Sequence, residues 1–148
     1  MSFFKAMDIS SSGLAAQRVR MNVLSANLAN AQSTRGDDGG PYRRRDVVFS
    51  AVPTGTQFED YLNETSGHGT ELRKVEVVGI HKDMNAPRHV YDPGNPDADA
   101  SGFVDLPNVQ VMSEMVNMIA ATRAFEANAT ALNDAKQMAM KALEIGRG

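Results

Sequence analysis

Apolar residues recur at helical spacing in the first part of the chain. Residues 14–33 contain no proline or glycine, and the serines at positions 10–12 could cap a helix that runs to about Ala31. A seven-residue repeat predicts one continuous apolar face, with a second apolar face beside it. The first face carries Leu14, Met21, Leu24, Leu28 and Ala31, and the second carries Ala16, Val19, Val23 and Ala26.

A longer helix is predicted toward the C-terminal end of the sequence. Residues 108–145 contain no proline or glycine, Asp105 or Asn108 could cap the helix, and Gly146 could end it. Two seven-residue series predict an apolar seam, and a further apolar face follows in the last half. The series are Val111, Met118, Phe125, Leu132 and Ala139, then Met115, Thr122, Ala129, Lys136 and Leu143; the further face is Ala131, Ala135, Met138, Ala142 and Ile145.

The middle of the chain has the pattern of short strands joined by loops. RDVVFSAV and LRKVEVVGI are rich in β-branched residues, and Val75 and Val77 alternate with charged neighbours. Five of the six prolines lie between residues 34 and 106, together with loop segments such as DPGNPDADASG. These runs predict a small sheet with a modest core.

The three patterns predict an α+β protein. An N-terminal helix occupies residues 1–33, a β-rich outer domain residues 34–106, and a C-terminal helix residues 107–148. We expect the two helices to pair antiparallel as a coiled coil, so that each buries one seam. The remaining apolar faces are then left for other copies or partners, because large exposed apolar surfaces mark interaction sites.

The composition excludes several classes of protein. The 148 residues include no cysteine, which excludes disulfides, zinc–thiolate sites and cysteine nucleophiles. A net charge of −3 argues against strong attraction to nucleic acid. No apolar run is long enough to span a membrane, so we expect no direct membrane insertion, and the first residues lack the apolar core of a cleaved signal peptide. Nine methionines and few aromatic residues suggest helix surfaces that pack adaptably.

Three features resemble functional motifs, but none predicts catalysis or a bound cofactor. Residues 97–102 match the first half of a calcium-binding loop, yet Asn108 stands where the loop needs a bidentate glutamate. Arg43–Arg45 form a basic run in an acidic zone, which favours surface ion pairs over contact with nucleic acid. The three histidines lack the spacing of metal ligands, and no nucleophile, acid–base pair or phosphate-binding loop is found. We therefore expect no enzyme activity, metal or cofactor.

Asparagines stand among alanines and leucines in both predicted helices, at Asn27, Asn30 and Asn128. An amide is costly to bury without hydrogen-bond partners. One interpretation is that these side chains are solvated, and another, for Asn30 alone, is a left-handed helix cap. The third is that buried amides, satisfied only by neighbouring groups, fix the register between packed helices.

The motifs of both helices resemble those of a known family. Two stretches resemble the N- and C-terminal signatures of flagellar basal-body rod proteins: SANLANAQST and RAFEANATALNDAKQMAMKALEIG. Two further stretches resemble the proximal-rod type in particular: GGPYRRRDVVF and YDPGNPDADASGFVDLPNVQVMSEMVNMI. The resemblance therefore covers nearly the whole chain. The assembly motif is predicted to be Ser25, Asn27, Leu28, Asn30, Met118, Arg123, Phe125, Asn128 and Leu132, and the axial seam Leu14, Met21, Leu24, Val111 and Met115.

The resemblance implies a structural role. The terminal helices would form the inner coiled coil of a rod and the middle zone an outer β domain. Subunits would pass through the flagellar type III export apparatus and assemble in the periplasm with self-copies and other rod proteins, beside the rod–ring adaptor and the inner-membrane ring. The rod would transmit torque from motor to hook. Two further hypotheses are a coiled-coil adaptor or secretion chaperone, whose helices are stable alone, and a DNA-binding protein that uses its arginine run.

Overall fold

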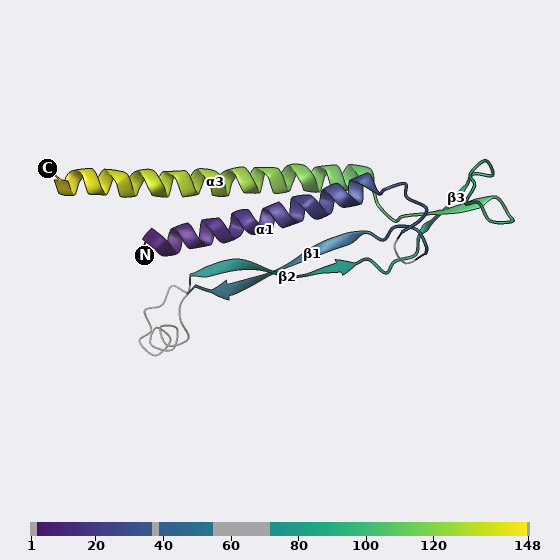
Figure 1. Ribbon diagram of the computed structural model, residues 1–148, viewed down its shortest axis with the longest axis horizontal. Coiled ribbons are helices and arrows are strands. Elements are labelled where there is room, and N and C mark those ends of the chain that lie inside the picture. The colour runs from purple at the N-terminus through teal and green to yellow at the C-terminus, as the bar shows by residue number, and fades with distance from the viewer. Residues whose placement is uncertain (1–2, 37–38, 55–71, 148) are drawn as a thin grey trace. The chain divides into compact units, whose positions relative to one another are not determined.

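The computed structural model describes residues 3–36, 39–54 and 72–147 of the chain. Within those residues a long helix stands at each end of the sequence and four strands lie between them (Figure 1). The elements are α1 (Phe3–Ala29), β1 (Arg45–Pro53), β2 (Arg73–Lys82), β3 (Arg88–Tyr91), β4 (Phe103–Leu106) and α3 (Val111–Arg147). This order confirms the predicted α+β class with terminal helices and a small strand-rich insert.

α1 begins earlier than the sequence predicted. The serine run was expected to cap the helix, but the helix already starts at Phe3 and includes all three serines. The Ser12 hydroxyl donates to the Ile9 carbonyl of the preceding turn (2.7 Å) and accepts a hydrogen bond from the Val75 amide of β2 (3.1 Å). A serine whose hydroxyl bonds to the preceding turn is tolerated inside a helix, so the run marks no boundary.

Asn30 closes the last turn of α1. Its backbone nitrogen donates to the Ala26 carbonyl (3.1 Å), and its side-chain nitrogen donates to the same carbonyl (2.9 Å). Its side-chain oxygen accepts a hydrogen bond from the Ser33 hydroxyl (3.2 Å). No non-glycine residue in the described part of the chain has a positive φ, so the left-handed cap considered for Asn30 is wrong.

β1 and β2 form a two-stranded sheet from the two predicted β-branched runs. At one end the Thr54 amide donates to the Leu72 carbonyl (3.0 Å), and at the other the Asp83 amide donates to the Arg44 carbonyl (2.7 Å). These bonds join the start of each strand to the end of the other, which is the antiparallel arrangement.

β3 and β4 form a second antiparallel pair, which the sequence analysis did not predict. Arg88 lies opposite Leu106, and Tyr91 lies opposite Phe103. Each strand has only four residues, so no alternating pattern stands out from the sequence around it. The rings of Tyr91 and Phe103 pack edge to face with their centroids 5.3 Å apart, which adds a favourable cross-strand contact.

The loop between β3 and β4 is held by hydrogen bonds to one carboxylate. Asp99 accepts from the amides of Ser101 (2.8 Å) and Phe103 (2.9 Å). These bonds, the one from Phe103 first, lower the pKa of Asp99 below its ordinary value. Gly102 adopts a φ of 81°, and a Cβ there would lie 2.9 Å from a ring carbon of Tyr91, so this turn requires glycine.

α3 starts later than predicted and runs further. Neither Asp105 nor Asn108 caps it, because residues 107–110 belong to no helix or strand and the helix begins at Val111. The first turn is closed by the Glu114 amide, which donates to the Gln110 carbonyl (3.0 Å). The helix continues through Gly146 to Arg147, so the predicted stop at the glycine is also wrong.

The chain divides into two compact units. The first contains the described residues of segments 1–19, 49–78 and 122–148, and the second those of 20–48 and 79–121. Each unit contains part of both helices. The buried apolar side chains of the described residues are Ala16 and Ala135 in the first unit, and Leu24, Ala31, Val104, Pro107, Val109 and Ala121 in the second. Because four of these eight are alanines, apolar burial within each unit is small. Over the described residues, neither helix combines the length and apolar character needed to cross a membrane.

Candidate functional site

A buried polar network in the second unit is centred on Asn27. The Asn27 side-chain nitrogen donates to the Arg45 carbonyl (2.7 Å) and to Glu114 Oε2 (3.0 Å). Its side-chain oxygen accepts from the Arg45 amide (2.9 Å) and from the Tyr42 hydroxyl (2.9 Å). A primary amide has two donor hydrogens and two acceptor lone pairs, and all four are used here. Asn27 is 0% exposed, and because these four bonds use every donor and acceptor of its amide, no water is needed to satisfy it.

The Asn27 amide acts toward β1 as a neighbouring strand would. It both donates to the carbonyl and accepts from the amide of the same residue, Arg45, at the start of that strand. Paired backbone bonds of this kind normally come from another strand. A helix side chain therefore satisfies the first exposed edge position of β1, which ties the end of α1 to the start of the hairpin.

Glu114 is the second centre of the network. It is only 2% exposed, and its two oxygens accept from Arg44 Nε (2.7 Å) and from Asn27. The hydrogen bond to Glu114 raises the pKa of Arg44, and burial raises the pKa of Tyr42. We call Asn27, Tyr42, Arg44, Arg45 and Glu114 the Asn27–Glu114 network. Removing one partner of such a buried charge pair typically costs about 3–5 kcal/mol, because the other charge stays buried.

The network joins three segments that are far apart in the sequence. The last turn of α1 meets the first turn of α3 at Asn27 and Glu114, and Arg44, which precedes β1, donates to Glu114. The interpretation that a buried asparagine is satisfied by neighbouring groups thus holds for Asn27. Asn30 instead bonds locally at the helix end.

One of the two series predicted for the α3 seam is displaced by one residue from the buried face. Glu114, Ala121 and Ala135 are buried, at spacings of seven and fourteen residues, and Asn128 of the same series is half-buried. Four members of the other predicted series are half-buried beside them: Met118, Phe125, Leu132 and Ala139. Val111 and Met115 were predicted to lie in the intramolecular seam, but they are 43% and 46% exposed. The hydrophobic pattern missed the Glu114 series because its members are small or polar. Alanine allows close approach, and Glu114 is buried through hydrogen bonds.

A close contact between the helices in the first unit involves Gly13 and Asn128. A Cβ built on Gly13 would lie 2.9 Å from Asn128 Nδ2, so the backbone of α1 approaches this side chain closely. Asn128 Nδ2 itself donates to the Ala124 carbonyl of its own helix (2.9 Å). Asn128 therefore makes a packing contact across the helices, and the hydrogen bond of its side-chain nitrogen stays within α3.

The other predicted assembly residues have varied exposure. Leu24 of the axial seam is buried. Ser25 and Arg123 are exposed. The half-buried members are Leu14, Met21, Leu28, Met118, Phe125 and Leu132.

The residues that matched a calcium loop have protein partners. Asp97 accepts hydrogen bonds from the Thr34 hydroxyl (2.6 Å) and from Arg35 Nε (2.9 Å), which lower its pKa below the ordinary value, the Thr34 bond first. The Asp99 carboxylate is turned toward backbone amides of its own loop. Within the described ranges, no cluster of side chains is suited to hold a metal ion. The loop instead anchors the segment that follows α1.

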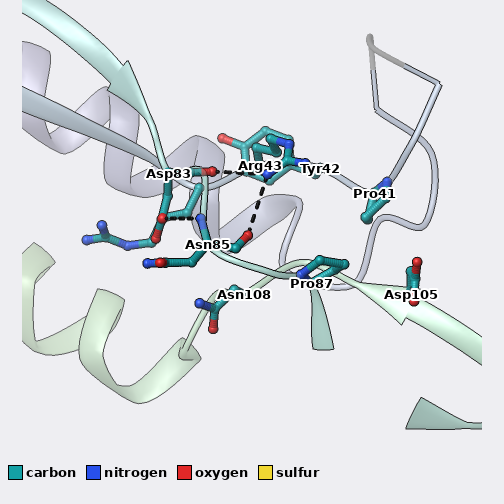
Figure 2. A pocket seen from close by; sticks show the side chains of 9 residues that line it. Pro41, Tyr42, Arg43, Asp83, Asn85, Pro87, Asp105 and Asn108 are labelled. Carbon is teal, nitrogen blue, oxygen red and sulfur yellow. Dashed lines mark hydrogen bonds between the residues drawn. The ribbon is translucent and has the colours of Figure 1, made fainter. Parts of the chain in front are cut away.

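The arginine run is divided between two tasks. Arg44 forms one ion pair of the predicted surface kind, to Asp46 (3.3 Å), and a second, to Glu114, that is buried. Arg43 points into a small cavity, where its guanidinium reaches the carbonyls of Asp83 and Asn85 (both 3.5 Å; Figure 2). The cavity has a volume of about 170 Å³, below the several hundred Å³ of ordinary ligand pockets, so we assign no ligand to it.

Sequence reasoning identified Asn27 but missed its main partner. Glu114 did not stand out by hydropathy, and although it lies in the segment that carries the family resemblance, nothing there singled it out as a partner of Asn27. The available signal was its position, because it lies in the first turn of a long helix and seven residues before Ala121. A buried asparagine also requires partners, but the sequence does not say which of many polar residues supplies them.

Comparison with known proteins agrees with this architecture. A family model described as "Flagella basal body rod protein" matches residues 7–36, which include Asn27. Another, described as "Flagellar basal body rod FlgEFG protein C-terminal", matches residues 100–145, which include Glu114. The two centres of the network thus lie in the two segments that match rod-protein models.

Full-length relatives share the same name. The chain is 41% identical to the flagellar basal-body rod protein FlgC of Borreliella burgdorferi, with all of both chains covered. It is 45% identical to that of Bacillus subtilis and 40% identical to that of Salmonella typhimurium, each over 99% of this chain and 100% of the relative. The chain therefore belongs to the FlgC family of flagellar basal-body rod proteins.

Proposed function

We propose that this structural subunit of the flagellar basal-body rod assembles through an apolar stripe on the first turns of α3. The stripe consists of Met112, Met115, Val116 and Ile119, and we call it the assembly stripe. Its side chains are 74%, 46%, 63% and 54% exposed. Exposed apolar side chains that are contiguous on one helix face favour burial against a partner.

The spacing of the stripe places it on one side of the helix. Its members follow the i, i+3, i+4, i+7 pattern of a single face. At 3.6 residues per turn this face is opposite the buried one that carries Glu114 and Ala121. The stripe ends where Arg123 reaches the same face one turn later. α3 thus has one side that packs within the chain and another that is free to pack against a second molecule.

We assign a helix of a second copy of this chain as the occupant of the stripe. Two observations support this. The stripe itself carries no charged side chain, which suits an apolar helix face, and α1 has such a face in its half-buried series Leu14, Met21 and Leu28. The resemblance to rod proteins also implies assembly with self-copies. Burial of the stripe would stabilise the contact at about 25 cal/mol per Å² of apolar surface.

The Asn27–Glu114 network gives this surface a fixed position. Glu114 lies between Met112 and Met115 in sequence, and its bonds to Asn27 and Arg44 hold the first turn of α3 in one orientation. Family membership supports the rest of the proposal: passage through the type III export apparatus, assembly in the periplasm beside the inner-membrane ring and the rod–ring adaptor, and a non-catalytic role in torque transmission. The observation that carries the proposal is the exposed stripe opposite a locked buried face.

The test is a charge placed in the stripe. A flagellated bacterium that lacks its own copy of the gene is complemented with the wild-type chain, Ile119→Glu or Ser113→Glu. We expect Ile119→Glu to abolish swimming and the recovery of complete rods, because a carboxylate cannot be buried unpaired in an apolar contact. Ser113 is exposed on the same helix and outside the stripe, so Ser113→Glu should swim normally.

Three results would decide the proposal. Normal motility with Ile119→Glu, at wild-type protein levels, would show that the stripe is not an assembly surface. Loss of motility in both variants would point to a general defect of α3. A photo-crosslinker at Val116 should join two copies of this chain, and a crosslink to a different rod protein would replace the assigned occupant.

A further inference from the structure

We infer that Met112 and Met115 form a modification site, at which oxidation to methionine sulfoxide blocks assembly of the free subunit. The inference rests on the proposed function of the assembly stripe and adds a regulation to it. The half of the stripe contributed by these two residues is chemically different from the half contributed by Val116 and Ile119, because only thioethers are oxidised under mild conditions.

The methionines differ in their access to an oxidant. Met112 is 74% exposed, and Met84, on the connection between β2 and β3, is 77% exposed. Met21 and Met118 are half-buried in the helices. Because oxidation follows exposure, Met112 and Met84 should react fastest, then Met138 (66% exposed), Met140 (54%) and Met115 (46%), and the half-buried pair slowest. Met84 lies outside both helices and so reports reactivity without assembly.

The chemistry requires only a peroxide. A thioether sulfur attacks one oxygen of hydrogen peroxide, the O–O bond breaks, and the sulfur gains an S–O bond while losing two electrons. The peroxide is reduced to water. The product is a polar sulfoxide that accepts hydrogen bonds, and reductases can return it to methionine.

Among the described residues, the side-chain donor in the first turn of α3 is the Ser113 hydroxyl, which is already bonded to Gln110 Oε1 (3.1 Å) and so is not free to satisfy a sulfoxide. Packing the stripe against an apolar face would therefore bury a strong acceptor unsatisfied, which is unfavourable. Methionine supplies an adaptable surface for packing, and the same thioether makes that surface sensitive to oxidation.

The first experiment measures reactivity on the purified full-length chain. Hydrogen peroxide is added, the reaction is stopped at intervals, and peptide mass spectrometry follows each methionine. We expect the sulfoxide to form at Met112 at about the rate of Met84 and roughly fivefold faster than at Met118. Equal rates at Met112 and Met118 would overturn the inference, because the stripe would then have no selective reactivity.

The second experiment measures the consequence in cells with a stable mimic. Glutamine resembles methionine sulfoxide in length and polarity. We expect the combined Met112→Gln and Met115→Gln chain to reduce the swimming rate at least about tenfold, while Met84→Gln and the combined Met112→Leu and Met115→Leu chain swim normally. Normal swimming of the glutamine pair would overturn the inference.

The two proposals fail in distinguishable ways. If Ile119→Glu stops assembly but the glutamine pair does not, the stripe is an assembly surface that tolerates polar residues at these two positions, and only the oxidation inference is lost. If Ile119→Glu assembles normally, the proposed function of the stripe fails as well. Circular dichroism of the purified variants confirms that each outcome reflects surface chemistry and not unfolding.

Discussion

Asn27 shows how one polar residue decides the geometry around it. Its amide can be buried in an apolar helix only if two acceptors and two donors surround it, and the chain supplies all four from α3 and from the segment that enters β1. Leucine, which fits the surrounding pattern better, would leave those groups without a partner. The cost of burying the unpaired groups, more than the strength of any one bond, makes the arrangement unique.

We predict that Asn27→Asp destabilises the chain in a pH-dependent way. The substitution keeps the size but places a second carboxylate beside Glu114 Oε2, where a donor now lies at 3.0 Å. Like charges raise the folded-state pKa of the introduced group above its unfolded value of about 4. The substitution therefore destabilises the folded chain least at pH values below the unfolded pKa of the introduced carboxyl. The destabilisation grows as the pH rises through the raised folded-state pKa.

Urea unfolding at pH 5 and pH 8 measures this effect. We expect a loss of roughly 3–5 kcal/mol at pH 8 and a clearly smaller loss at pH 5. Ser25→Asp is the matched control, because it adds the same charge two residues away at an exposed position. Equal losses at both pH values for Asn27→Asp would contradict the buried contact with Glu114.

At the scale of elements, both helices pack through small and polar residues more than through large apolar ones. α3 buries Glu114, Ala121 and Ala135, and α1 buries Gly13, Ala16 and Asn27 and one large apolar residue, Leu24. Asn27 lies fourteen residues after Gly13, and Asn128 lies fourteen residues after Glu114, so each helix makes its contacts two heptads apart. The seven-residue period was predicted correctly, and one of the two series predicted on α3 was off by one position.

We predict a thermodynamic coupling between Gly13 and Asn128. Alanine is favoured over glycine inside a helix by about 1 kcal/mol, but a Cβ on Gly13 would lie 2.9 Å from Asn128 Nδ2. Gly13→Ala should therefore gain about 1 kcal/mol in an Asn128→Ala background and gain less, or lose stability, in the wild-type chain. A double-mutant cycle by urea unfolding should give a coupling of about 1 kcal/mol.

Gly146 provides the control for this cycle. It is also helical, but a Cβ built there has no neighbour within 4 Å. Gly146→Ala should show the helix preference for alanine with no dependence on Asn128. Strict additivity of Gly13→Ala and Asn128→Ala would mean that the two helices do not touch at this point.

At the scale of the whole molecule, apolar burial is thin and uneven along α3. The last fully buried side chain of that helix is Ala135, and from Lys136 to Gly146 only Ala139 is even half-buried. An isolated helix of about a dozen residues is marginal in water. The end of α3 therefore depends on contacts outside the chain for its stability.

Hydrogen exchange on the purified chain tests this expectation. We predict that amides of residues 136–146 exchange fastest within α3, and that amides near Glu114 and Ala121 exchange slowest, because only the latter are tied to α1 and β1. Uniform protection along α3 would indicate that the helix is stable without a partner. That result would favour the alternative hypothesis of a coiled-coil adaptor, whose helices are stable alone.

The sequence by itself determined the two helices, their seven-residue period, the β1 and β2 runs and the family. These follow from local patterns, since periodicity, proline and glycine positions and signature motifs are readable without knowing what packs where. Asn27 was also identified from the sequence, because an amide in an apolar helix requires partners.

Only the tertiary structure decided which partners satisfy it and which face is buried. By hydropathy, Met115 is the better candidate for burial than Glu114. The hydrogen bonds from the neighbouring Arg44 and Asn27 nevertheless make Glu114 the buried residue. The short strands β3 and β4 and the interior position of Gly13 likewise depend on contacts from distant segments. A position in a pattern is a local property, whereas burial of a polar or small residue depends on what approaches it.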